Sequence, residues 1–399
     1  MIYKIIITSV ILIVSFCCNA GENLIFNGFA TLGMEYTDPA TEIGNTNRDS
    51  NFSFSDLTRL GLQTTWLATD KLSFTGQIIT KGRKDFDVDL SWAFAKYNFN
   101  KYYSIRIGRQ QIPIYILADF QHVGYTYPWP QPPREVYWQL PFSDFDAISN
   151  IVNLNFGEWD LTTQIAYGKT ESEAGTINGK HELDLSAYGI NAELTNRKLR
   201  LGASYFKSSL STDLTGIYRN QAELLIASEP LAGIYLNQIS QDTIDGWFKV
   251  DNADCSFKSI GATYDNNNLL IIGEFTQRRV EELYPDTDGW YFTLGYRFNN
   301  IMPYLSFGKI HTKNYENKHL HADGLIEETV INYITSEMER VLIVNQKETA
   351  IGVRYDVTEY AAVKAQYKKV DTYGQIGTFG NIPASNTIDY FTLAIDLVY

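Results

Sequence analysis

The chain offers few side chains with the spacing of a catalytic or metal centre. His319 and His321 are separated by one residue and His311 precedes them, but no cysteine or spaced carboxylate completes a ligand set around them. The sequence contains no G-x-S-x-G, no H-E-x-x-H and no phosphate-binding loop of the Walker type. We therefore expect neither an enzyme nor a cofactor, and charged side chains become the candidates for function.

Charged side chains form two sets that could create an electric field across a water-filled passage. Acids on one wall and bases on the other would orient dipolar solutes and influence ions. Each base, taken singly, could instead pair with a neighbour at a strand end or with a lipid phosphate. The acidic set lies in segment 110–146 and comprises Asp119, Glu135, Asp144 and Asp146 with the single base Arg134; the basic set comprises Arg59, Arg106, Arg200, Arg297, Arg354, Lys364 and Lys368.

The elements that must position these charges are β-strands, because hydrophobic residues recur with period 2 along almost the whole chain. Each segment is close to the ~10 residues that a tilted strand needs to cross a bilayer. The pattern predicts sixteen strands, an even number, at about 24–36, 56–68, 71–80, 88–98, 103–109, 147–156, 159–168, 183–195, 199–208, 256–265, 268–277, 289–299, 302–311, 347–356, 359–370 and 386–399.

The connections between these strands alternate between short turns and mostly longer loops. A membrane barrel has short turns at one end and longer loops at the other, whereas a soluble sandwich has no physical reason to separate them. Seven turns and both termini would lie at one end. The eight loops at the other end are 37–55, 81–87, 110–146, 169–182, 209–255, 278–288, 312–346 and 371–385.

The two faces of each predicted strand differ in polarity. In 289–299, Trp290, Phe292 and Leu294 alternate with Thr293 and Gly295, and many apolar faces end in an aromatic residue. A membrane barrel with apolar residues outside and polar residues inside has this pattern, with aromatic girdles at the headgroups. A tyrosine-rich soluble barrel is the alternative, but sixteen strands would enclose a lumen too wide for side chains to fill.

Composition excludes several other classes of protein. The net charge of −13 argues against a nucleic-acid partner, which requires a basic surface. After residue 20 no apolar run approaches the ~18 residues of a membrane-spanning helix. The 27 Tyr and 22 Phe exclude an intrinsically disordered chain.

Residues 1–20 have the features of a cleaved signal peptide. Lys4 provides the basic start, residues 5–16 are apolar, and Cys18 and Ala20 are small residues at the −3 and −1 positions of a cleavage site. A retained anchor and a lipoprotein are the alternatives. Cleavage would leave Cys255 as the one remaining cysteine, so the exported domain 21–399 would have no internal disulfide.

Taken together, the signal peptide, the sixteen strands, the terminal Tyr399 and the long segment 110–146 resemble the general porins of the Gram-negative outer membrane. The resemblance covers essentially the whole mature chain. It implies that segment 110–146, which holds six of the eleven prolines, folds into the barrel and narrows the pore. The segment lacks the Pro-Glu-Phe-Gly-Gly turn usual in that family, and loop 81–87 is short for the latch that joins its subunits.

The same resemblance implies partners and a location. It implies an outer-membrane protein in contact with lipid and lipopolysaccharide, possibly a homotrimer. The terminal aromatic would be part of the signal read by the barrel-assembly machinery. The last strand presents this signal on one face, through Phe391, Leu393, Ile395, Leu397 and Tyr399.

The expected function is passive diffusion of small hydrophilic solutes and ions. An outer-membrane hydrolase or protease on a barrel and a substrate-specific channel remain alternatives. An energy-coupled transporter would need roughly twenty-two strands and a plug, more than this chain can supply. The segment Tyr218–Gln238 has helical composition and is interpreted as a lid within an external loop.

Overall fold

The computed structural model describes seven stretches of the chain, 23–39, 51–176, 179–213, 249–281, 284–314, 343–373 and 385–399, and the single residues 215, 246 and 328. The predicted signal peptide, His319, His321 and the segment Tyr218–Gln238 lie outside these stretches.

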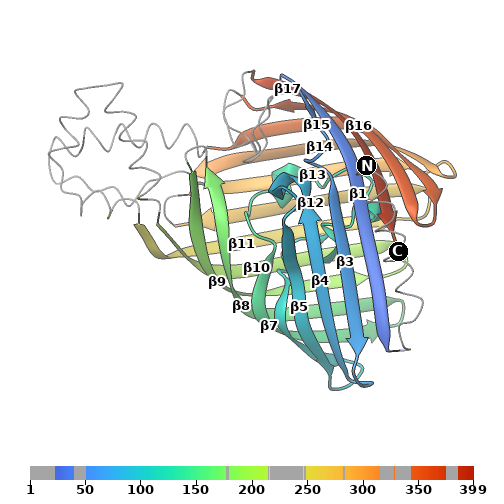
Figure 1. Ribbon diagram of the computed structural model, residues 1–399, viewed down its shortest axis with the longest axis vertical. Helices are drawn as coiled ribbons and strands as arrows, with labels where there is room; N and C mark the ends of the chain where they lie inside the picture. Colours follow the sequence, from blue (N-terminus) through green and yellow to red (C-terminus); the bar gives the residue numbers. More distant parts are fainter. Residues whose placement is uncertain are drawn as a thin grey trace, which may run out of the picture.

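All described strands belong to one antiparallel sheet that closes on itself (Figure 1). The two-residue strand β2 (Phe52–Ser53) pairs with β1, and the other sixteen strands form the barrel wall. These are β1 (Leu24–Asp38), β3 (Arg59–Leu67), β4 (Leu72–Lys81), β5 (Val88–Asn98), β6 (Tyr103–Gln111), β7 (Asp144–Phe156), β8 (Trp159–Thr176), β9 (Gly179–Thr195), β10 (Leu199–Asp213), β11 (Lys249–Asp265), β12 (Leu269–Val280), β13 (Asp286–Tyr296), β14 (Ile301–Asn314), β15 (Asn345–Thr358), β16 (Ala361–Asp371) and β17 (Thr387–Val398).

The barrel closes where the first strand meets the last. β1 and β17 pair from Phe29 opposite Val398 to Asp38 opposite Asp389, and Tyr399 exchanges backbone hydrogen bonds with Gly28. Every other strand pairs with its neighbours along the chain, so the described wall has no unpaired edge at membrane depth. The prediction of a sixteen-stranded antiparallel barrel is confirmed.

The separation of turns from loops is also confirmed, with two corrections. The predicted loop 209–255 is shorter, because β10 runs to Asp213 and β11 begins at Lys249. The predicted loop 169–182 is mostly strand, because β8 and β9 remain paired from Asp160 opposite Thr195 to Thr176 opposite Gly179. The sequence there is rich in Glu, Ser and Gly and lacks apolar alternation. Strands that extend beyond the lipid need no apolar outer face, so hydrophobic period alone cannot find their ends.

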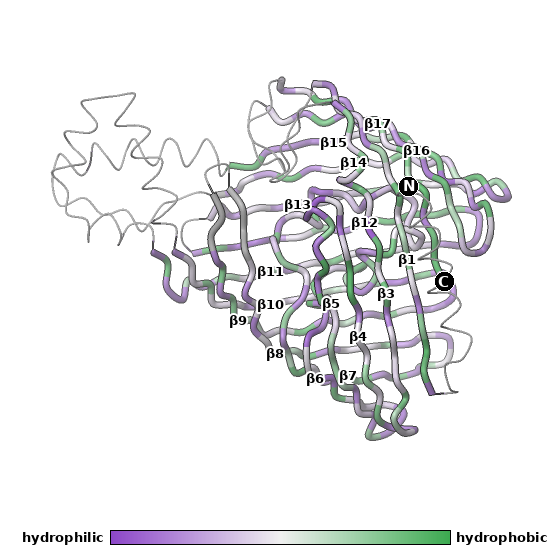
Figure 2. Tube along the Cα trace, in the orientation of Figure 1, coloured by the Kyte–Doolittle hydropathy of each residue, from purple (hydrophilic) through white to green (hydrophobic). Residues whose placement is uncertain are grey.

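Apolar side chains cover the outer wall. On β13, Trp290, Phe292, Leu294 and Tyr296 are 38 to 44% exposed, whereas the intervening Thr293 is fully buried. Figure 2 shows the resulting alternation of hydrophilic and hydrophobic residues along many strands. The predicted outward face of the last strand has the same orientation: its members, Phe391, Leu393, Ile395, Leu397 and Tyr399, are all exposed.

The helical elements are short and lie in the loops. They are η1 (Gly82–Lys84), η2 (Ala118–Phe120), η3 (Gly124–Thr126) and α2 (Arg134–Tyr137). Within the described residues, no helix is long and apolar enough to cross a membrane. Three of the four lie between β6 and β7, in the segment that holds the candidate acids.

Candidate functional site: the barrel lumen and its inward loop

The connection between β6 and β7, residues 112–143, folds into the barrel; we call it the inward loop. Figure 1 shows its helices surrounded by the strands of the wall. Helix α2 contacts β12, β13 and β14, and η3 contacts β1 and β17. The loop therefore reaches both the middle of the wall and the seam where the barrel closes, as the fold prediction required.

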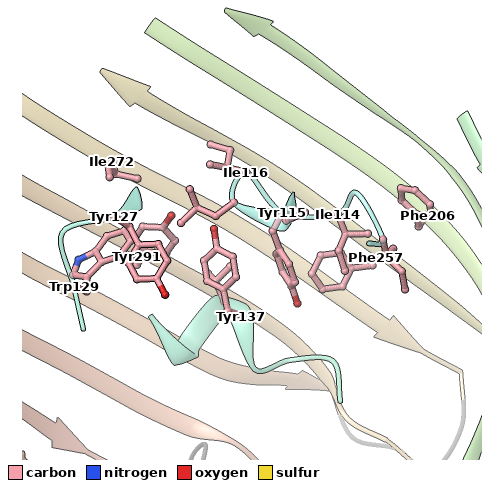
Figure 3. Close-up of a cluster of buried hydrophobic side chains, with 14 of the residues drawn as sticks. Ile114, Tyr115, Ile116, Tyr127, Trp129, Tyr137, Phe206, Phe257, Ile272 and Tyr291 are labelled. Atoms are coloured by element: carbon pink, nitrogen blue, oxygen red, sulfur yellow. The ribbon is translucent and has the colours of Figure 1, made fainter. Parts of the chain in front are cut away.

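An apolar cluster fixes the inward loop to the inner wall. Tyr115, Tyr127, Trp129 and Tyr137 of the loop are buried against wall residues (Figure 3), and the rings of Trp129 and Tyr291 meet edge to face at 5.4 Å. Burial of each such side chain stabilises the docked loop by about 1.5–3 kcal/mol. The expected polar inner face is therefore absent from this sector, where the wall presents Phe206, Phe257, Ile272 and Tyr291.

Hydrogen bonds orient the cluster. The Trp129 Nε1–H donates to Thr293 Oγ1 at 3.0 Å, and the Tyr137 hydroxyl donates to Glu274 Oε2 at 2.7 Å. The other oxygen of Glu274 accepts from the Ile116 backbone N–H at 3.0 Å. These bonds pair Trp129, Tyr137 and Glu274, and they give the loop a defined register on the wall.

Three of the predicted wall bases bind the inward loop. Arg354 Nη1 donates to the carbonyl oxygens of Tyr125 at 2.6 Å and Tyr127 at 3.2 Å. Lys364 Nζ donates to those of Gly124 at 2.6 Å and Trp129 at 2.9 Å, and Arg59 donates to the Tyr127 hydroxyl. These cations face inward as predicted, but they anchor the loop and are not open to passing solutes.

Lys364 is also paired with an acid, as are most of the other predicted wall bases. Lys364 and Lys368 are buried and lie 2.7 Å from Asp396 and 3.3 Å from Glu348. Arg200 lies 2.6 Å from Glu193, and Arg297 pairs with Asp265 at the turn end of the barrel. These pairs leave Arg106 as the candidate base whose main electrostatic partner is on the inward loop.

Only one of the four candidate acids, Asp119, occupies the expected position. Asp119 is exposed on the inward loop and lies within electrostatic range of the half-buried Arg106. This arrangement, an acid on the loop facing a base on the wall, is the one that the sequence predicted for the whole set.

The expectation of an open acidic loop is wrong for the other three acids. Asp146 belongs to β7 and lies on its outer face, where Arg109 binds both carboxylate oxygens at 2.9 Å. Asp144 begins the same strand and shares its parity with Asp146. Glu135 is fully buried, as is its neighbour Arg134, which lies 3.8 Å from Glu35 and stacks on Trp138.

The sequence reasoning missed Lys96 as a lumen residue. Lys96 lies directly opposite Arg106 in the pairing of β5 and β6, and the guanidinium of Arg106 stacks on Phe94 at 4.7 Å. The two residues are equally distant from the turn that joins their strands, so hairpin register could have found the pair. Two neighbouring cations therefore lie on this part of the inner wall, and Arg106 is the one that interacts electrostatically with Asp119.

Burial changes the pKa of two groups on the inward loop. The pKa of His122 lies well below its ordinary value because the ring is buried and Lys81 and Arg59 are close, so the ring is neutral near pH 7. Burial and the neighbouring Glu348 carboxylate raise the pKa of Glu135 to about 8, although Lys368 opposes this. Gln346 Nε2 donates to Glu135 Oε1 at 2.6 Å, so the Glu135 side chain keeps a partner in either protonation state.

The raised pKa of Glu135 predicts a pH-dependent stability. The folded protein holds this proton up to about pH 8, whereas an unfolded glutamate loses it near 4.5. The folded state therefore binds more protons, and the free energy of unfolding should fall as pH rises across this window. Thermal unfolding of the wild type from about pH 5 to about pH 9 should show a steeper decline than that of Glu135→Gln, which retains an oxygen for Gln346. Parallel profiles would contradict the assignment.

The described residues contain no cluster of three or more His, Cys, Asp or Glu side chains that could hold a metal ion. His311 lies on β14 at the loop end of the barrel, opposite Asp288.

Comparisons with known proteins show which solved structures share this architecture. No family model and no curated protein matches the chain. Among solved structures, OmpT from the outer membrane of Vibrio cholerae is 11% identical with a TM-score of 0.55, over 95% of this chain and 99% of that one. OmpF of Salmonella typhi, in complex with daunomycin, is 17% identical with a TM-score of 0.54, over 94% and 98%.

An anion-selective porin from Comamonas acidovorans is similar to the same degree. It is 11% identical with a TM-score of 0.53, and the match covers 94% of this chain and 99% of that one. The likeness extends along nearly the full length of each protein, and the Comamonas barrel is a porin. The closed ring of sixteen antiparallel strands is the fold of the outer-membrane porins.

Proposed function

We propose that the protein is an outer-membrane porin through which small hydrophilic solutes and ions diffuse passively. The loop end faces the outside of the cell and the turn end faces the periplasm, to which the predicted signal peptide directs the chain. The inward loop is the constriction, and Asp119, Arg106 and Lys96 are the charges nearest the path of the solute.

The observation that supports this proposal is the one-sided docking of the inward loop. Most of its apolar cluster and its anchors lie on the side formed by β10 to β17 and β1, and Arg59 of β3 adds one contact beyond the seam. Inward residues of the opposite wall are polar and only half-buried, among them Gln63, Lys96 and Gln164. A polar passage beside a docked loop suits hydrated solutes.

Planar-bilayer recording tests the proposal. The purified barrel should give discrete, ohmic conductance steps, and liposomes that contain it should swell at rates that fall with the size of an added sugar. A correctly folded barrel that gives neither conductance nor swelling would contradict the proposal. Turnover of a peptide or ester substrate without solute flux would favour a barrel enzyme instead.

We also propose that the outward face of β17 is read during assembly. Phe391, Leu393, Ile395 and Leu397 form its apolar row, and Tyr399, at the end of that row, is 65% exposed. Tyr399 also closes the barrel through its two backbone hydrogen bonds with Gly28. A barrel-assembly partner would meet both features at the end of synthesis.

Deletion of Tyr399 is expected to lower the amount of protein in the outer membrane severalfold, while export across the inner membrane continues. The deletion removes an exposed aromatic ring and two closing hydrogen bonds. Tyr399→Phe is the matched control, because it keeps the ring and the backbone and should assemble normally. Membrane fractionation with immunoblotting measures the amount of both variants in the outer membrane. Normal levels of the deletion variant would contradict the proposed role of Tyr399 in assembly.

The assembly state is proposed to be a homotrimer. OmpT of Vibrio cholerae has been described in a trimer form. Light scattering of the detergent-solubilised protein, with the detergent mass subtracted, would give three copies, and a single copy would contradict the proposal.

A further inference from the structure

The tip of the inward loop carries an exposed aromatic ring. The tip is the turn η2, and its last residue, Phe120, is 40% exposed, whereas Tyr115, Trp129 and Tyr137 of the same loop are buried against the wall. Docking of the loop does not account for an apolar ring that stays in contact with water. A flat apolar surface of this kind can pack against the apolar face of a solute.

Two arginines locate this tip within the barrel. Asp119 lies within electrostatic range of Arg106 on β6, and the guanidinium of Arg200 on β10 lies 5.6 Å from the centre of the Phe120 ring. Strands β7, β8 and β9 follow one another in the wall between β6 and β10 (Figure 1). The tip therefore lies in front of the inner surface of these three strands.

The inner surface of these strands carries amide and hydroxyl side chains. Gln164 of β8 lies directly opposite Asn191 of β9, and Asn153 of β7 lies opposite Thr162 of β8. All four are half-buried, while residues of the opposite parity, such as Ile165, are exposed on the outer face. We call these four inward residues the polar patch.

Part of the hydrogen-bonding capacity of the polar patch is unused. Gln164 Nε2 donates to Ser149 Oγ at 3.0 Å, and Asn153 Oδ1 accepts from Thr162 Oγ1 at 3.0 Å. Among the described residues, nothing pairs with the Gln164 carbonyl oxygen or with either end of the Asn191 amide. The patch thus offers donors and acceptors on adjacent strands to a solute that carries several hydroxyl groups.

The charges at the edges of the polar patch are balanced. Arg200 lies 2.6 Å from Glu193, and Arg106 has Asp119 within electrostatic range. Lys96 is one strand farther from the patch, on β5. An ion of either sign that entered this space would meet a charge of each sign. A neutral solute with many hydroxyl groups therefore suits the patch better than an ion does.

The tip is held in one position over the patch. Ile116 packs directly on Gly202 and Gly261, which lie opposite each other on β10 and β11, where any larger residue would displace it. The Phe120 backbone N–H donates to the Leu117 carbonyl oxygen at 2.9 Å and closes the turn. A ring that is already in place loses little conformational freedom when a solute binds.

We propose that the tip and the polar patch form a binding site for neutral sugars, which gives the passage a preference for carbohydrates. The apolar face of a pyranose ring packs on Phe120, and its hydroxyl groups exchange hydrogen bonds with Gln164, Asn191 and Asn153. A flat aromatic solute would also pack on the ring, but it would leave the amides without partners, which costs free energy. The inference rests on the proposed function, because it names the solute of the same passage.

Separate variants test the two parts of the site. Phe120→Ala removes the ring, and the double variant Gln164→Ala with Asn191→Ala removes two amides. Phe120→Tyr keeps an aromatic face and should bind sugar like the wild type. The matched control is Phe292→Ala, which removes an equally exposed ring, 40%, from the outer face of β13. Heat-modifiable migration checks that each barrel is folded.

Sugar binding is measured in planar bilayers as the decrease in ion current when the neutral trisaccharide raffinose is added, relative to the sugar-free current of the same variant. The decrease should saturate in the wild type, whereas a polyethylene glycol of equal hydrodynamic size should lower the current without saturation. Phe120→Ala should raise the half-saturating raffinose concentration about fivefold, the usual contribution of one aromatic contact. The double variant should raise it about thirtyfold, the usual contribution of two neutral hydrogen bonds. Phe292→Ala should leave it unchanged.

Three results would overturn the inference while the barrel still conducts. A decrease that does not saturate with raffinose would remove the site and leave the proposed porin function intact. Tighter binding of the nucleoside cytidine or of the anion gluconate would overturn the assignment of a neutral sugar. Equal half-saturating concentrations in all variants would overturn the assigned residues.

A barrel that does not conduct would contradict the proposed function and not the site. Raffinose binding to the detergent-solubilised protein, measured by isothermal titration calorimetry, then decides the second question. Binding that Phe120→Ala weakens and Phe292→Ala does not would uphold the site, and the absence of binding would overturn it.

Discussion

Replacement of Gly289 by alanine is expected to increase the single-channel conductance more than any other single change to the inner wall. Gly289 lies on β13 beneath helix α2, and a Cβ atom there would overlap the backbone oxygen of Glu135 and the Gln139 amide nitrogen. A backbone atom cannot move aside alone, so α2 must lift from the wall.

Lifting α2 disrupts the buried Arg134–Glu35 pair and the Gln346–Glu135 hydrogen bond. Breaking one buried ion pair costs about 3–5 kcal/mol, so the displaced loop loses a large part of the free energy that holds it against the wall. The wider passage would appear in bilayer recordings as larger steps with more open-channel noise.

Gly295→Ala is the matched control. Gly295 lies on the same strand and is also buried, but a methyl group at this position would meet its nearest neighbour, Tyr304 Cβ, at 3.4 Å, an ordinary contact. This variant should conduct like the wild type. Wild-type conductance in a folded Gly289→Ala barrel would show that α2 does not limit the passage.

Asp119→Asn is expected to shift the reversal potential in a salt gradient towards anions. Asp119 is the candidate acid that remains exposed on the inward loop, and it lies within electrostatic range of Arg106, the cross-strand neighbour of Lys96. For an ion that passes about 5 Å away in water, one unit charge changes the free energy by about 0.8 kcal/mol, or about fourfold in local concentration. The shift should shrink at high ionic strength because salt screens the charge.

Asp146→Asn removes the same charge from the outer face, where Arg109 already neutralises it. This control should leave the reversal potential unchanged. Equal shifts in the two variants would mean that the total charge of the loop end, and not the geometry of the lumen, sets selectivity.

The wall of the barrel was predictable because lipid imposes a local rule. A residue such as Leu393 must be apolar and Thr392 can be polar, so period 2 identifies the strand without knowledge of its partners. Beyond the lipid the outer face need not be apolar, so period 2 no longer identifies a strand there. The extensions of β8 and β9 were therefore interpreted as loop.

The lumen was less predictable because its contacts join residues far apart in the chain. Trp129 meets Thr293 and Glu135 meets Gln346, and no local pattern links them. Asp146 illustrates a second cause. It was assigned to a loop, so the alternation of inward and outward residues along a strand was not used to find the face on which it lies. Tyr291 and Ile272 illustrate a third, because an apolar inner wall is recognised only when the loop that covers it is known.

The position of the inward loop also has a consequence for the order of folding. Arg134 lies between Glu35 of β1 and Tyr390 of β17, and Gly124 rests against Thr31 and Asp396, which hydrogen-bond to each other across the seam at 2.6 Å. The inward loop contacts both strands of the closing seam from inside the barrel. If the seam formed first, the loop could enter only by disturbing these contacts. Docking of the inward loop and pairing of β1 with β17 should therefore occur in one kinetic step. In that step the first and last strands pair around a loop that already lies against the central strands.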